Sequence, residues 1–267
     1  MSRMPSLNIL KYTTVEVPTI SSTDLATKAR AIIRDYGLRV LPVVENGRLI
    51  GIVSRLNILT VTSSKSNLLV RDIMEEPKTI LKANYSLRKA VEEMLKADIW
   101  YAPVVSEDNR FIGLFGLENI IREFYVKNVD VNKLPVKDFM STNVVTARKG
   151  EDVSSILRKM LKHRYSGLPV INDKGKVVGI VTQHDLLKAG AARILLESER
   201  SKGHRGVKAL DIMNTNVCKV KPDTSLKEVA KLMVKRNIGR IVVVNNKDKL
   251  LGIIDREDVV KAYIKYL

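Results

Sequence analysis

One unit occurs four times along this chain of 267 residues, and that repetition restricts the possible folds more than any other feature. In each copy, a β-branched apolar run is followed by a polar turn, a second apolar run that begins after a glycine, and a charged helix start. The copies are GLRVLPVVENGRLIGIVSRLNIL (37–59), DIWYAPVVSEDNRFIGLFGLENII (98–121), RYSGLPVINDKGKVVGIVTQHDLL (164–187) and NIGRIVVVNNKDKLLGIIDREDVV (237–260). The aligned glycines, Gly51, Gly113, Gly179 and Gly252, are 62, 66 and 73 residues apart. The pattern predicts a β-hairpin that leads into a helix.

The segments upstream of these hairpins repeat as well. A short Asp-(Ile/Phe)-Met element, a brief strand and a helix precede copies two, three and four, whereas the first copy lacks the Asp-Ile-Met element. Ser86, Asp152 and Ser225 stand where a helix N-cap is expected. Each unit therefore follows the order β-α-β-β-α over about 60 residues. Because so small a unit buries little apolar area alone, we expect the units to pair through their apolar sheet faces.

These repeats resemble CBS domains, which pair into Bateman modules. The resemblance implies an α+β fold with CBS domains over residues 1–64, 68–130, 131–192 and 207–267. It further implies two modules, 1–130 and 131–267, in a disc-like arrangement similar to the γ subunit of AMP-activated protein kinase.

A hydroxyl and an acid lie three residues apart where the second strand of the third copy enters its helix. These residues are Thr182 and Asp185, and they match the ribose-phosphate motif of CBS domains, Gly-h-h-(Ser/Thr)-x-x-Asp, where h is hydrophobic. Free amides at a helix start attract a phosphate, and the carboxylate can accept hydrogen bonds from a ribose. The same spacing is that of a capping box, which only stabilises a helix start. Both interpretations remain open from the sequence.

The other copies keep less of this motif. Ser54 and Asn57 retain the hydroxyl without the charge, and Gly116 with Asn119 retains neither group, which predicts an empty or structural site. Asp255 and Asp258 place two negative charges together, which disfavours a phosphate unless Arg256 or Arg240 compensates. The fourth site is therefore expected to favour an uncharged or cationic tail, as in an adenosylmethionine-type ligand.

Further pocket residues follow from the resemblance. It implies that the strand entering the third copy, Val144, Val145 and Thr146, borders the adenine of the Thr182 site. It also implies that Arg39 and Arg240 reach toward phosphates, although an ordinary surface role is equally open for Arg240. Trp100 either stacks on a base or fills an interface.

The net charge of +17 is distributed unevenly. Residues 1–134 hold 19 basic and 15 acidic residues (+4), and residues 135–267 hold 27 and 14 (+13). This asymmetry suggests a polyanionic partner, most plausibly RNA or the ribosome, while a solvated, lysine-rich surface of thermophilic type is the alternative. The candidate contact residues lie in and after the insertion between copies three and four: Arg193, Arg200, Lys202, His204, Arg205 and Lys208.

No catalytic constellation and no metal-like histidine spacing is visible, so the sequence predicts a regulatory protein that is not an enzyme and needs no metal. AMP, ADP or ATP is the expected ligand. The single cysteine, Cys218, and the absence of a secretory signal or a long apolar run predict a cytoplasmic protein with no membrane span. A nucleotide-responsive subunit of an enzyme or transporter is the alternative function, and a protein partner or a homodimer is expected in that case.

Overall fold

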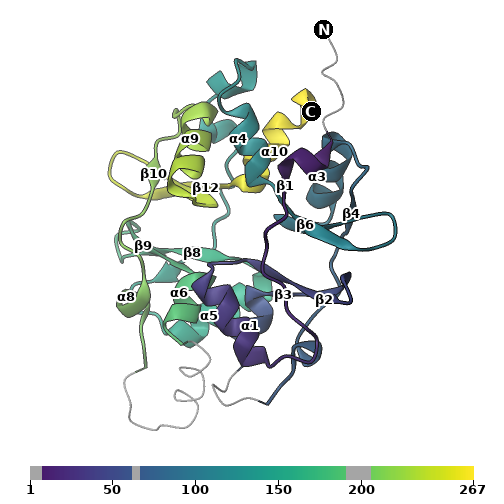
Figure 1. Ribbon diagram of the computed structural model, residues 1–267. Coiled ribbons are helices and arrows are strands. Elements are labelled where there is room, and N and C mark those ends of the chain that lie inside the picture. Colours follow the sequence, from purple (N-terminus) through teal and green to yellow (C-terminus); the bar gives the residue numbers. More distant parts are fainter. Residues whose placement is uncertain (1–7, 62–66, 191–205) are drawn as a thin grey trace.

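The computed structural model of the protein describes residues 8–61, 67–190 and 206–267, in which every repeat contains an antiparallel hairpin followed by a helix (Figure 1). The hairpins are β2 (Val40–Glu45) with β3 (Arg48–Ser54), β5 (Tyr101–Val105) with β6 (Phe111–Gly116), β8 (Gly167–Ile171) with β9 (Val177–Thr182), and β11 (Arg240–Val244) with β12 (Leu250–Asp255). The helices that follow them are α2 (Arg55–Leu59), α4 (Glu118–Phe124), α6 (Gln183–Lys188) and α10 (Arg256–Tyr263).

A longer amphipathic helix precedes each hairpin. These helices are α1 (Ala26–Asp35), α3 (Leu87–Lys96), α5 (Val153–His163) and α9 (Leu226–Arg236). A two-residue strand joins three of the hairpins in parallel: β4 (Leu81–Lys82), β7 (Ala147–Arg148) and β10 (Lys219–Val220). Because the buried residues of each helix recur at helical spacing, one face packs inward while the other meets solvent.

Two of the three expected helix caps form. The side chains of Ser86 and Ser225 each accept a hydrogen bond of 3.3 Å from a backbone amide of the first turn. The prediction of a side-chain cap at Asp152 is wrong. Its carboxylate instead accepts a bond of 2.9 Å from the ammonium group of Lys208, and an ion pair replaces the cap bond.

The segment that enters each repeat crosses to the hairpin of its partner. Short helical turns carry the repeated Asp-(Ile/Phe)-Met elements: the 3₁₀ turns Val70–Asp72 and Val136–Asp138, and α8 (Ala209–Ile212). The methionine that follows each turn lies on the aligned glycine of the paired repeat: Met74 on Gly51, Met140 on Gly252, and Met213 on Gly179. Backbone bridges adjoin each contact, Ile52 with Glu75, Ser141 with Ile253, and Ile180 with Asn214. The two sequence motifs therefore form the two halves of one contact.

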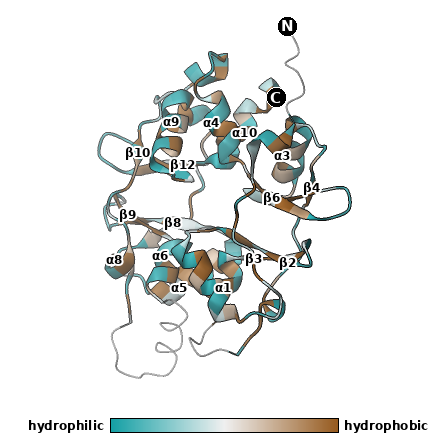
Figure 2. Ribbon diagram, viewed as in Figure 1, coloured by the Kyte–Doolittle hydropathy of each residue, from teal (hydrophilic) through white to brown (hydrophobic). Residues whose placement is uncertain are grey.

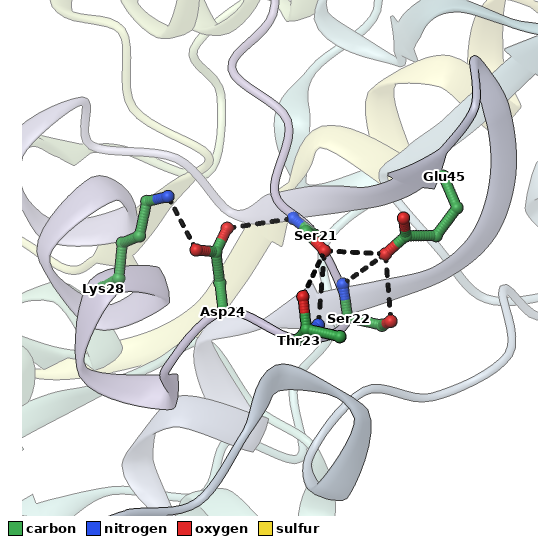
Figure 3. A network of polar contacts seen from close by, with 6 residues as sticks. All are labelled: Ser21, Ser22, Thr23, Asp24, Lys28 and Glu45. Atoms are coloured by element: carbon green, nitrogen blue, oxygen red, sulfur yellow. Dashed lines mark hydrogen bonds and ion pairs between the residues drawn. The ribbon is translucent and has the colours of Figure 1, made fainter.

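The first and second repeats depart from this scheme. Strand β1 (Thr13–Thr14) takes the place of the methionine element and pairs antiparallel with β6, so that the Thr14 carbonyl lies against Gly113. Helix α1 has no side-chain cap at Leu25. Figure 3 shows what fixes the chain before it: Glu45 accepts hydrogen bonds from the hydroxyls of Ser21 (2.8 Å) and Ser22 (2.9 Å).

The two principal cores lie between modules rather than within them. One core joins the helices of repeats one and three, and the other joins those of repeats two and four. These cores correspond to the lower and upper halves of Figure 1, and Figure 2 shows hydrophobic residues concentrated on strands such as β6 while the loops are mostly hydrophilic. The expected sheet-face pairing contributes a smaller cluster around Val177, Val242 and Val244. Helix packing thus holds the two modules together.

The crossing contact makes a prediction about stability. An alanine methyl at Gly179 would lie 2.5 Å from the Met213 sulfur, so Gly179→Ala should lower the free energy of unfolding by about 1–3 kcal/mol. Gly150→Ala is the matched control, because its methyl would meet open space, and it should change stability by less than about 0.5 kcal/mol. Urea unfolding of both variants measures the effect, and equal stabilities would contradict the contact.

Candidate functional site

A cavity of about 520 Å³ lies where repeats three and four face one another. Thr182 and Asp185 line it from repeat three, at the junction of β9 and α6. Repeat four contributes its entering segment and the start of β11, and the first module contributes residues that include Arg39, Arg55 and Tyr101. The lining residues from repeat four include Asn214, Asn216, Val217, Cys218, Gly239 and Arg240. The volume falls in the range of small-molecule pockets.

Thr182 and Asp185 also cap helix α6. The Asp185 carboxylate accepts two hydrogen bonds on its Oδ2 atom, from the Thr182 amide at 2.8 Å and from the Thr182 hydroxyl at 2.6 Å. The capping role expected from the sequence therefore exists, and it coexists with a position on the cavity wall. Since both bonds end on Oδ2, the other carboxylate oxygen, Oδ1, is the one that can accept from a ligand.

The residues expected beside this site lie elsewhere. Val144 and Val145 line a different cavity, of about 270 Å³, together with Asp255 and Asp258 of repeat four. The Thr146 carbonyl accepts a bond of 3.0 Å from the Lys159 ammonium group. Because entering segments cross to the partner repeat, the segment that faces Thr182 comes from repeat four and not from repeat three. The prediction that a strand-entering segment borders the Thr182 site named the segment of repeat three, whereas the segment of repeat four lies there.

The motif residues of repeats one and two have different surroundings. Ser54 lines a cavity of about 290 Å³, and its hydroxyl donates to the Asn57 side chain at 2.5 Å in a second capping box. In repeat two, the Asn119 amide donates to the Tyr12 carbonyl at 2.7 Å and so fastens the segment before β1. Asn119 therefore performs a structural task, and it also lines a cavity of about 320 Å³ together with Tyr12 and Thr13.

Three arginines surround the ring of Trp100 at the centre of the molecule. The guanidinium carbons of Arg39, Arg240 and Arg256 lie 5.1, 5.4 and 5.9 Å from the ring centroid. Of the two roles open to Trp100, the structure supports the interface role, since repeats one, two and four meet here. Arg39 and Arg240 line both the Ser54 and the Thr182 cavities.

Burial changes the pKa values of two of these arginines. It lowers the pKa of Arg240 to about 10 and also lowers the pKa of Arg39. Arg240 donates to the Gly167 carbonyl and to the Ser166 hydroxyl of repeat three, so it is not an ordinary surface arginine. Its guanidinium group bridges repeats three and four on the wall of the Thr182 cavity.

Two arginines that directly follow a motif hydroxyl or acid, Arg55 and Arg256, are buried. Arg55 was not expected from the sequence, and Arg256, expected to compensate the two acids of repeat four, lies outside the wall of their cavity. Arg55 is 8% exposed and donates to the carbonyls of Leu38 (2.6 Å) and Gly37 (2.5 Å). Arg256 is 2% exposed; it donates to the Tyr101 hydroxyl at 2.9 Å and lies 3.5 Å from Glu118. The sequence signal that could have identified these residues is an arginine at the first position of the helix that follows the hairpin.

The expected polyanion contacts are only partly visible. Arg193, Arg200, Lys202, His204 and Arg205 lie outside the described residues. Lys208 is described, and its ammonium group is held in the ion pair with Asp152. Within the described ranges, none of the helices has the length and hydropathy of a membrane-spanning segment, and no three His, Cys, Asp or Glu side chains cluster as metal ligands would.

Comparison with known proteins identifies the family. The family model of the CBS domain matches residues 10–64, 70–126, 136–192 and 209–265. The chain belongs to the CBS-domain family. It is 29% identical over 276 residues to the uncharacterized protein MJ1225 of Methanocaldococcus jannaschii, covering 93% of this chain and 95% of that one.

Solved structures agree with this assignment. The crystal structure of MJ1225, described as a proposed archaeal homologue of g-AMPK, matches with a TM-score of 0.85 and 27% identity over 96% of this chain and all of that one. A conserved protein of Pyrococcus horikoshii shares the fold, with a TM-score of 0.66 and 23% identity over 96% of this chain and 99% of that one. The expected α+β fold of four CBS repeats in two Bateman modules is confirmed.

The fourth CBS repeat has an acidic cavity. Burial and the neighbouring Asp255 carboxylate raise the pKa of Asp258 to about 7, and burial raises the pKa of Glu257. The Asp255 side chain accepts from the amides of Glu257 (2.9 Å) and Asp258 (3.3 Å), which caps α10. Arg240 and Lys261 are the basic residues on the wall of this cavity. The cavity therefore differs in charge from its counterpart at Thr182.

The raised pKa of Asp258 predicts a loss of stability as the solution becomes less acidic. The folded chain holds a proton that the unfolded chain releases, so this contribution is complete below pH about 4 and is lost as pH rises through about 7. Relative to wild type, Asp258→Asn should therefore become more stable between pH 5 and pH 8. Urea unfolding at both pH values tests this, with the exposed Asp173→Asn as control. A difference between Asp258→Asn and wild type that does not change with pH would contradict it.

Proposed function

We propose that this CBS-domain protein is a non-enzymatic regulator that binds an adenine nucleotide in the cavity between repeats three and four. The observation that carries the proposal is the 520 Å³ cavity, whose wall combines Thr182 and Asp185 with the partly buried cations Arg39 and Arg240. Members of the CBS-domain family bind adenosine ligands and act as regulatory modules. AMP, ADP and ATP are the candidate ligands.

Each part of a nucleotide has a suitable partner in this cavity. The free oxygen of Asp185 accepts from the ribose hydroxyls, and the Thr182 hydroxyl lies next to the phosphate position. Val217 and Val242 offer apolar surface to the base. At the partly buried guanidinium groups of Arg39 and Arg240, loss of hydration outweighs the attraction of the nearby Glu118 and Asp255 carboxylates, so a phosphate would compensate their charge.

The other cavities suit weaker or different ligands. Ser54 offers a ribose contact without charge on the wall of its cavity, where Arg39 and Arg240 also lie, whereas Asn57 is outside that wall. The carboxylates of Asp255 and Asp258 favour a cationic tail, so an adenosylmethionine-type ligand is the alternative for the fourth site. Adenosylmethionine binding that survives Asp185→Asn but not Asp258→Asn would support this alternative.

Replacing the Asp185 carboxylate by an amide tests the nucleotide site. Asp185→Asn keeps a side chain that can cap α6, as Asn57 does in repeat one, but removes the charge that holds the ribose. We expect AMP affinity to fall about tenfold or more, since hydrogen bonds to charged groups contribute about 1.5–3 kcal/mol. Titration calorimetry with AMP, ADP, ATP and adenosylmethionine measures the change.

Asp72→Asn is the matched control for this substitution. Asp72 accepts a hydrogen bond of 2.8 Å from the Leu69 amide in another helical turn and lies outside the cavity wall. It should leave AMP affinity unchanged. No binding of any of the four ligands to wild type would overturn the proposal, and equal affinities of wild type and Asp185→Asn would remove Asp185 from the site.

The macromolecular partner is a separate part of the proposal. The charge of +13 on residues 135–267 supports a polyanion, most plausibly RNA or the ribosome. The likeness to MJ1225, described as a proposed homologue of g-AMPK, supports a regulatory subunit of an enzyme or transporter instead. Co-sedimentation with ribosomes should weaken steeply with salt in the first case. A nuclease-resistant complex dominated by one protein would favour the second.

A further inference from the structure

One motif position, the residue directly before the acid or its counterpart, differs in chemical type between the third repeat and the other three. The residue two positions after Ser54, Gly116, Thr182 and Asp255 is Leu56, Glu118, His184 and Glu257, respectively. Only the third repeat has a side chain there that can gain a positive charge near neutral pH. His184 is thus peculiar to the repeat with the complete ribose-phosphate motif.

His184 forms part of the wall of the 520 Å³ cavity, directly before Asp185. Its Nδ1 atom is shielded from solvent and has no hydrogen-bond partner among the described residues. An imidazolium carries a hydrogen on both ring nitrogens, so a shielded Nδ1 without a partner disfavours the charged form. This geometry favours the neutral ring.

The charges around His184 also favour its neutral form. Burial lowers the pKa of His184, and the cations of Arg55, Lys188 and Arg39 lower it further, against the opposing effect of Asp185. Two more cations from repeat four stand on the same wall. The charged groups around the ring are Arg39 and Arg55 from repeat one, Asp185 and Lys188 from α6, and Arg236 and Arg240 from repeat four.

We infer that His184 adds to the selectivity of this site for a phosphorylated ligand, because it takes up a proton from solvent when the phosphate of an adenine nucleotide binds. The inference rests on the proposed nucleotide site. A phosphate placed among these cations reverses the field that keeps the ring neutral, and the imidazolium then adds one positive charge beside the ligand. Adenosine has no phosphate, so its binding brings no negative charge that would favour protonation of the ring.

The sign of the resulting pH dependence follows from linkage. The ring is neutral in the free protein and protonated in the complex over the interval between its two pKa values, so affinity falls as pH rises through that interval. Each unit of difference between the two pKa values corresponds to about a tenfold change in affinity. The phosphate group of AMP also titrates near pH 6, and a histidine variant is needed to separate the two contributions.

Titration calorimetry of the full chain with AMP at pH 6 and pH 8 tests the inference. Wild-type affinity should fall about tenfold more over this range than the affinity of His184→Gln. Repeating the titration in buffers of different ionisation enthalpy counts the protons taken up by wild type and does not depend on any variant. His163→Gln is the matched control, because His163 lines the Ser54 cavity instead.

The outcomes separate this inference from the function on which it rests. A pH dependence and a proton uptake that wild type and His163→Gln share, but His184→Gln loses, would support it, as would adenosine binding without proton uptake. If AMP binds and the proton count is the same in wild type and His184→Gln, the inference is overturned while the proposed function stands. If AMP does not bind to wild type at all, the proposed function itself fails.

Discussion

The contact between a methionine of one repeat and a glycine of its partner positions the cavities at three of the four motifs in the described part of the chain. Met213 occupies the space above Gly179, and Met140 and Met74 do the same at Gly252 and Gly51. Because only glycine leaves room for this approach, the entering segment of each repeat is committed to its partner's hairpin. The motif of one repeat therefore always faces the entering segment of the other, and a ligand site belongs to a pair and never to a single CBS domain.

The arginines around Trp100 connect these pairs. Cores between repeats one and three, and between two and four, bring the two modules together, and Arg39, Arg240 and Arg256 gather around Trp100 at their junction. Burying so much positive charge is unfavourable unless anions are close. Glu118 serves Arg256, whereas Arg39 and Arg240 stand on the walls of cavities. Arg39 and Arg240 thus belong both to the junction between the modules and to the walls of two cavities.

Local patterns in the sequence predicted local structure well. The hairpins, the caps at Ser86 and Ser225, and the Thr182–Asp185 pair all follow from residues a few positions apart. Contacts between repeats could not be read in this way, and Val144 and Val145 were assigned to the cavity of the wrong repeat for that reason. Asp152 fails as a cap because Lys208, 56 residues away, competes for its carboxylate.

A crystal structure of the protein with AMP would test the central claim most directly, because it shows which repeats hold the ligand. The account predicts the ribose on Asp185 and the base against Val217 of repeat four, with the phosphate near Arg39 and Arg240. AMP with its base against Val144 and Val145 while its ribose contacts Asp185, or a cavity closed by side chains, would contradict it.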